Sequence, residues 1–173
     1  GNQSQEKIQE MSRLLLILTI SAACAFTGCS VQKDASAHSF QEVIYEKTLC
    51  FGPCPAFIFH VLPNGMCEME ITRPFREGAL GQLKPGNYTA DLSKTAQVWN
   101  SQVESSIDKS SYLIMKDLYD NPRITDLPST ITILYGKSVT NRYKGPDLST
   151  LYTLLDESMA SLNWIPNTKT NLE

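Results

Sequence analysis

The residues whose types and spacing could support chemistry stand together in one short stretch, Cys-Phe-Gly-Pro-Cys-Pro, at positions 50–55. Two neighbouring thiols can act as a redox dithiol, hold a metal ion or form a structural disulfide. These three chemistries belong to different classes of protein. The residues around Cys50 and Cys54 have to distinguish between them.

Two of the three chemistries lack the neighbours that they need. A redox dithiol of the thioredoxin kind uses a Cys-x-x-Cys spacing at the start of a helix. Here the spacing is one residue longer, and Pro-Ala-Phe-Ile-Phe-His-Val after Cys54 predicts a strand. Copper-delivery proteins with Cys-x-x-x-Cys-Pro add a distant histidine, because Cu(I) favours thiolate and imidazole ligands. The two histidines, His38 in an expected tether and His60 in the next strand, are poorly placed for that role.

We therefore predict a disulfide between Cys50 and Cys54. Gly52 and Pro53 supply turn chemistry between the sulfurs, and closing so small a loop stabilises the fold by roughly 2 kcal/mol. Cys67 leaves other pairings open, although its place on an alternating strand indicates a buried free thiol. A dithiol/disulfide or copper-handling use of the Cys50/Cys54 pair stays as the alternative hypothesis.

The N-terminal part of the chain predicts export and lipidation. Arg13 precedes an apolar run at 14–26, which is shorter than the ~20 residues of a membrane-spanning helix. Phe-Thr-Gly-Cys at 26–29 resembles the lipobox of bacterial lipoproteins, with Phe26 in place of the usual leucine. The resemblance implies that Cys29 carries the lipid and becomes the first mature residue. An ordinary signal peptide with a chance cysteine is the alternative.

These features divide the chain into four parts. We assign 1–28 to an upstream extension and a lipoprotein signal peptide, 29–39 to a tether, 40–165 to a single domain and 166–173 to a disordered tail. A flexible tether of about ten residues reaches roughly 17 Å, so the domain would stay close to its membrane. We expect a lipid-anchored protein of the cell envelope, at the outer membrane, with the periplasmic or outer side left open.

Composition and the hydrophobic pattern bound the partners and the fold. A net charge of −3 over 173 residues, without a run of Lys and Arg, argues against a nucleic-acid partner, which would require a basic face.

Asn64-Gly65 between two strand-like runs is a strong hairpin signal, with both turn residues expected at positive φ. Strands are expected at 40–49, 56–62, 67–72, 87–93, 130–135 and 137–143, a long loop at 73–86, and helices at 93–107 and 146–162.

We predict an α+β fold, with a mostly antiparallel sheet of about five to six strands and two helices packed on one face. Outside the cysteine pair no catalytic constellation is found. No Gly-x-Ser-x-Gly motif occurs, and His60 is the one histidine outside the tether. We therefore expect no enzymatic activity, no cofactor and no metal site. The candidate binding residues are His60, Tyr88 and Tyr119, although such tyrosines belong more often to the core and its rim.

Four segments carry a family resemblance: CFGPCPAFIFHVLPNG, GNYTADLS, TDLPSTITILYG and GPDLSTLYTLLDESM. Over about residues 40–162 they resemble a family of bacterial envelope proteins described as domain of unknown function 6438. Membership implies a shared fold and no established activity. Cys67 and the stretch at 72–85 depart from the family pattern.

These features favour a non-enzymatic envelope lipoprotein. We expect its sheet face or its long 73–86 loop to bind another envelope protein. The sequence leaves the oligomeric state open.

Overall fold

The computed structural model describes residues 39–167. The predicted signal peptide, the lipidation site at Cys29, nearly all of the tether and most of the tail lie outside the described residues. Within the described range, no helix is both long enough and apolar enough to cross a bilayer.

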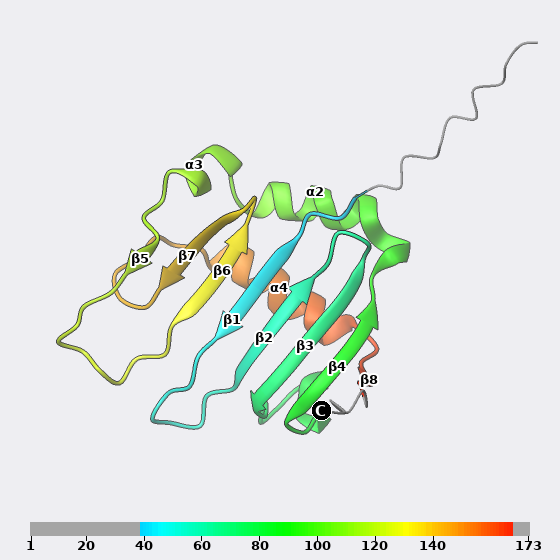
Figure 1. The fold of residues 1–173 in the computed structure, drawn as a ribbon, viewed down its shortest axis with the longest axis horizontal. Coiled ribbons are helices and arrows are strands. Elements are labelled where there is room, and N and C mark those ends of the chain that lie inside the picture. Colours follow the sequence, from blue (N-terminus) through cyan, green and yellow to red (C-terminus); the bar gives the residue numbers. More distant parts are fainter. Residues whose placement is uncertain (1–38, 168–173) are drawn as a thin grey trace, which may run out of the picture. The chain divides into compact units, whose positions relative to one another are not determined.

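One eight-stranded sheet organises the described residues, in the order β5-β7-β6-β1-β2-β3-β4-β8 (Figure 1). Neighbouring strands run antiparallel except β5 and β7, which run parallel. The first strand therefore lies inside the sheet, with later strands added on both sides. The strands are β1 Val43–Lys47, β2 Ala56–Val61, β3 Met66–Arg73, β4 Gly86–Asp91, β5 Leu118–Tyr119, β6 Thr130–Leu134, β7 Lys137–Asn141 and β8 Ile165–Pro166.

Three α-helices accompany the sheet: α2 Ala96–Ser106, α3 Lys109–Leu113 and α4 Ser149–Ser161. The longest of them, α4, runs across the back of the sheet in Figure 1. The apolar stripes predicted for α2 and α4 turn toward the sheet, because residues three and four apart share one face of a helix. The stripe residues Trp99, Val103, Leu151, Leu155 and Met159 are all buried in a single core cluster.

Each of the six longer strands gives alternate residues to this core. On β2, Phe57, Phe59 and Val61 are buried while Ile58 and His60 face away from the helices. We call the side of the sheet opposite the helices the open face. Following the strand register, it carries Ile44, Glu46, Ile58, His60, Glu68, Glu70, Asn87, Thr89, Ile131, Ile133, Ser138 and Thr140.

The prediction of five to six strands and two helices is therefore correct in class and incomplete in number. The missed strands β5 and β8 have two residues each, which is too short to show a periodic pattern. The missed helix α3 has five residues and is held by one side chain. Tyr112 is fully buried, and its hydroxyl donates to the Thr132 carbonyl oxygen at 2.9 Å.

Aspartate side chains order the turns that precede the two longer helices, whose N-cap residues Thr95 and Leu148 make no side-chain cap bond. The Asp91 carboxylate accepts the Ser93 amide at 2.7 Å, at the start of a 3-10 turn, η3 Ser93–Thr95, that leads into α2. The Asp147 carboxylate accepts the Ser149 amide at 2.9 Å before α4. These hydrogen bonds hold the pKa of both carboxyl groups below the usual range, because they favour the charged form.

The first hairpin is present, but its turn differs from the prediction. Only Gly65 of the Asn64-Gly65 pair has positive φ, at 85°. The Gly65 amide donates to the Leu62 carbonyl oxygen and the Leu62 amide to the Met66 carbonyl oxygen, both at 2.9 Å. This is the longer hairpin loop in which a turn is followed by one left-handed glycine. A turn with two residues at positive φ occurs instead between β6 and β7, at Tyr135 and Gly136.

We predict that Gly65→Ala destabilises the fold more than Gly136→Ala. Both glycines lie in hairpin turns with φ near 80°, so each alanine meets the left-handed penalty of about 1–2 kcal/mol. A Cβ on Gly65 would also lie 2.6 Å from the Phe40 ring, whereas nothing lies within 4 Å at Gly136. Urea unfolding of the two variants measures the difference. Equal losses would show that the Phe40 contact does not constrain the hairpin.

Candidate functional site

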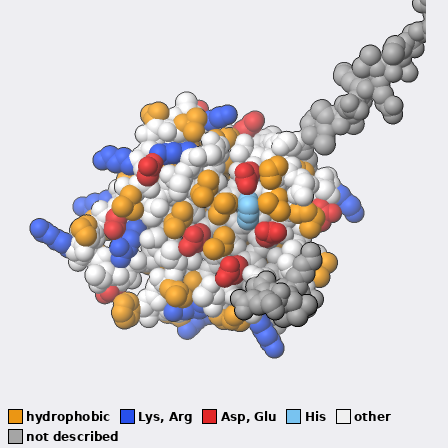
Figure 2. All heavy atoms as spheres, viewed as in Figure 1, with side chains coloured by type: hydrophobic (Ala, Val, Ile, Leu, Met, Phe, Trp, Pro, Cys, Tyr) orange, Lys and Arg blue, Asp and Glu red, His pale blue; other side chains and the backbone are white. Residues whose placement is uncertain are grey.

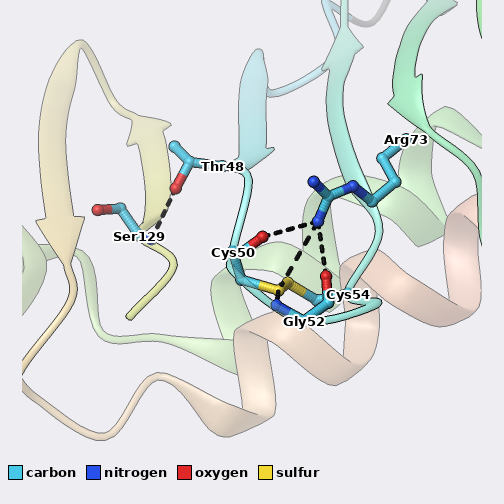
Figure 3. The surroundings of a disulfide bond; sticks show 6 residues. All are labelled: Thr48, Cys50, Gly52, Cys54, Arg73 and Ser129. Atoms are coloured by element: carbon cyan, nitrogen blue, oxygen red, sulfur yellow. Dashed lines mark hydrogen bonds between the residues drawn. A yellow bond between two sulfur atoms is a disulfide. The ribbon is translucent and has the colours of Figure 1, made fainter. Parts of the chain in front are cut away.

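Cys50 and Cys54 are joined by a disulfide, with their Cα atoms 6.2 Å apart (Figure 3). The bond closes the connection between β1 and β2, which we call the cysteine loop, residues 50–54. The third described cysteine, Cys67, is free and buried. The predicted pairing is therefore the one that the structure contains.

Arg73 at the end of β3 fixes the cysteine loop from one side. Its Nη1 atom donates to the carbonyl oxygens of Cys50 and Gly52 at 2.8 and 2.7 Å (Figure 3). A register shift at Ala56 brings Arg73 opposite the start of β2, beside the loop. A charged donor that satisfies two carbonyls restrains the loop more than a neutral one would.

The chain just before the cysteine loop is fixed to a second strand. The Thr48 amide donates to the Ser129 carbonyl oxygen at 3.0 Å, and the Ser129 amide donates to the Thr48 hydroxyl at 2.8 Å (Figure 3). Ser129 immediately precedes β6. The disulfide, the Arg73 contacts and the Thr48–Ser129 pair therefore hold the loop in one conformation.

Phe51 projects from this restrained loop. Its side chain is 90% exposed, the highest value among the large hydrophobic residues that the structure describes. Leu49, two residues earlier, is 53% exposed. The sequence interpretation treated Phe51 as part of the turn and missed it as a surface feature. The sequence signal for this exposure was the place of Phe51 between two cysteines of a short loop, where the core cannot bury its aromatic side chain.

The surroundings of the sulfurs bear on their chemistry. The Gly52 amide lies 3.2 Å and the Arg73 Nη1 atom 3.9 Å from the Cys50 sulfur, so a reduced Cys50 would have a cation and a donor beside it. After Cys54 the chain enters β2 and not a helix. Over residues 39–167, no group of three or more His, Cys, Asp or Glu side chains is arranged to hold a metal ion.

The three candidate binding residues do not form one site. His60 lies on the open face, where its Nε2 atom is 2.9 Å from a Glu42 carboxylate oxygen. Tyr88 is 8% exposed on the core side of β4, and its hydroxyl donates to the Lys84 carbonyl oxygen at 2.9 Å. Tyr119 lies on β5, four strands from His60, and its hydroxyl accepts the Lys116 amide. His60 and Tyr88 nevertheless both line one hollow beside the open face, whereas Tyr119 does not.

The open face is the larger surface feature (Figure 2). The pale-blue histidine in the figure is His60, with carboxylates around it and hydrophobic side chains between them. A hollow of about 220 Å³ beside it is lined in part by Ile58, Glu68, Glu70 and Asn87. The alternation along residues 130–135 predicted Ile131, Ile133 and Tyr135 on one face. Ile131 and Ile133 share the open face, whereas Tyr135 packs against the core beside Tyr112. The alternation did not predict that Ile133 lies beside Ile44 of β1.

Three further hollows lie elsewhere on the described residues. One of about 260 Å³ beside the cysteine loop is lined mainly by apolar side chains, including Phe57, Phe75 and Leu80. Its charged residues Lys47 and Asp156 are 3.5 Å apart and pair with each other. The other two, of about 430 and 510 Å³, lie between α2 and α4. None of them brings together groups that could carry out chemistry.

Cys67 contributes to the core and not to a site. Its side chain has no exposure, and burial together with the Asp91 charge raises the pKa of the thiol to about 12. A thiol that stays protonated is a poor nucleophile and a poor metal ligand.

Comparison with known proteins gives a family for this chain and no activity. Residues 41–159 match the family model described as Domain of unknown function (DUF6438). The chain belongs to the DUF6438 family. No curated protein and no solved structure matches it. The family assignment covers the cysteine loop, the open face and both longer helices, and it attaches no activity to any of them.

We predict that replacing both loop cysteines by serine lowers the free energy of unfolding by about 2 kcal/mol, the value for closing so short a loop. The fold should persist, because the buried core cluster includes neither cysteine. Urea unfolding monitored by tryptophan fluorescence measures the loss. Wild-type protein unfolded with a reductant should show the same loss, and an unchanged stability would contradict a structural role.

Proposed function

We propose that this DUF6438 protein is a lipid-anchored component of the bacterial cell envelope whose domain binds another envelope protein without catalysing a reaction. The export signal before Cys29 supports the anchor. The surface disulfide supports an oxidising compartment, because cytosolic thiols are kept reduced. The family assignment is compatible with this role, since it carries no activity.

Phe51 is the observation that carries the proposal. Aromatic side chains anchor many protein interfaces. The affinity of such an interface depends on how much conformational freedom these side chains lose on binding. Ordering a mobile side chain costs about 0.5–1.5 kcal/mol. The Cys50–Cys54 disulfide and the two Arg73 hydrogen bonds already hold the backbone around Phe51, so most of the ordering precedes binding.

The position of the cysteine loop favours a protein over the anchoring membrane as the contact. The described chain enters the sheet at Ser39, at one end of β1, and the loop follows the opposite end of that strand (Figure 1). A lipid on Cys29 would attach the domain from the Ser39 end. Phe51 therefore lies at the end of β1 that is farther from the anchored terminus.

We predict that a photoreactive phenylalanine analogue at position 51 forms one crosslinked product of defined mass in the intact envelope. The same analogue at Ile114 serves as the control, because that side chain is 86% exposed and lies just after α3. It should give no such product. Cys29→Ser should reduce crosslinking from position 51 as the protein leaves the membrane fraction. Identical products from positions 51 and 114, or none from either, would count against the interaction domain.

The dithiol or copper-handling role is the second candidate, and one contact favours it. Arg73 and the Gly52 amide next to the Cys50 sulfur would stabilise a thiolate after reduction. That arrangement makes a disulfide easier to reduce than one in neutral surroundings. The absence of a following helix argues in the other direction.

For the binding role, we predict a reduction potential for the Cys50–Cys54 pair below about −300 mV, as in structural disulfides. Equilibration of the purified protein with glutathione or dithiothreitol buffers gives the value. The reduced protein should also bind no copper in a competition with a Cu(I) chelator. A potential near those of the thiol–disulfide exchange proteins would favour the alternative role. An Arg73→Met variant would then show whether the guanidinium sets that potential.

A further inference from the structure

The open face is built from two cross-strand rows. In the first, Ile133, Ile44, His60, Glu68 and Thr89 lie side by side from β6 to β4. The second row repeats the pattern one step along the strands, with the residues Thr140, Ile131, Glu46, Ile58, Glu70 and Asn87. Isoleucines therefore fill the middle of the face, and carboxylates lie among them and beside them.

The charge of this face has one sign. Glu46, Glu68 and Glu70 lie on the two rows, and Glu42 adds a fourth carboxylate beside His60. No Lys or Arg occupies a position on either row, and no described Lys or Arg forms an ion pair with any of the four. Carboxylates that lie close together without counter-charges repel one another, and a cationic partner would relieve this repulsion.

The four isoleucines make the face more than an acidic surface. Ile44 pairs directly with Ile133 across β1 and β6, and Ile58 and Ile131 flank Glu46 in the other row. Ile58 is 38% exposed, and the others are half-buried. β-branched side chains on the solvent side of a sheet, without a covering helix, are typical of a surface that another element covers.

We propose that the open face docks a cationic amphipathic helix of a partner protein. The partner's aliphatic side chains would lie on the isoleucines, and its Lys and Arg side chains would reach the carboxylates on β1 and β3. The proposal deepens the binding role above and rests on it for the partner's place in the envelope. From β7 to β4 the face crosses six strands, roughly 24 Å at ~4.8 Å per step, the length of a helix of about 16 residues.

Other occupants fit these residues less well. An anionic lipid surface would be repelled by the four carboxylates. A small cation would leave the isoleucines uncovered, and the side chains are not arranged as a metal site within the described part of the chain. A strand added at either edge of the sheet, beside β5 or β8, would leave the isoleucines and carboxylates in the middle of the open face uncovered.

Three labelled peptides of about 16 residues test the proposal on the purified full chain by fluorescence anisotropy. One is a leucine–lysine amphipathic helix, the second replaces each lysine by glutamate, and the third scrambles the first. We expect the first to bind at least roughly tenfold more tightly than either of the others. Equal binding of the scrambled peptide would overturn the amphipathic part of the proposal, and equal binding of the acidic peptide would overturn the charge part.

Variants locate the binding. Glu68→Gln with Glu70→Gln should weaken the lysine peptide by about fivefold, and Ile58→Ser should also weaken it. The matched control is Glu104→Gln with Glu157→Gln, which removes the same charge from exposed positions on α2 and α4. It should leave the affinity unchanged. All of these positions are exposed, so thermal unfolding should show that each variant is folded.

A loss of affinity in the Glu104/Glu157 variant equal to that in the Glu68/Glu70 variant would overturn the assignment to the open face. Direct cosedimentation of the protein with anionic vesicles, without peptide, that is lost in the Ile58→Ser variant would overturn the choice of a protein partner. The peptide experiment uses the purified chain and the crosslinking experiment uses the intact envelope, so their outcomes are separate. A failed peptide experiment with a persistent crosslink would reject this inference alone. Peptide binding without a crosslink from position 51 would count against the interaction proposed through Phe51 and leave the open-face assignment in place.

Discussion

The structure depends on one constraint: a single sheet is covered by helices on one face only. Because successive side chains of a strand point to opposite faces, burying Phe57, Phe59 and Val61 under α4 and α2 forces Ile58 and His60 to the other side. A one-residue slip of any strand would exchange the two sets. The core therefore decides which residues are available for binding.

The hairpin and the cysteine loop protect that register at the two ends of β2. Gly65 sets the turn after β2 and lies against Phe40. The Cys50–Cys54 disulfide closes the connection before β2, and Arg73 ties it to the end of β3. A strand fixed at both ends cannot shift by one residue. The disulfide and the Arg73 contacts of the loop therefore hold the register of β2, whereas the exposed Phe51 side chain does not contribute to it.

The sequence was sufficient to predict the elements that have a period. The stripes on α2 and α4, the six longer strands and the one-sided burial of Cys67 all follow from spacing. The elements that it missed are held by tertiary contacts, as α3 is by Tyr112. The contacts that hold the cysteine loop around Phe51 could not be predicted, because Arg73, which donates to the Gly52 carbonyl oxygen, is distant in sequence. The joining of Ile44 to Ile133 depends on pairing β1 with β6, which no local pattern specifies.

The two proposed surfaces are connected through β2. Ile58 follows Cys54 by four residues, which at ~3.3 Å per residue is at most about 13 Å along an extended strand. A partner that covers the isoleucines at this end of the open face would therefore come close to Phe51. Because the disulfide and Arg73 fix the start of β2, they orient both the loop and the first exposed residue of the face. Fixing β2 at this end therefore presents an aromatic side chain and an aliphatic, anionic surface in a constant arrangement.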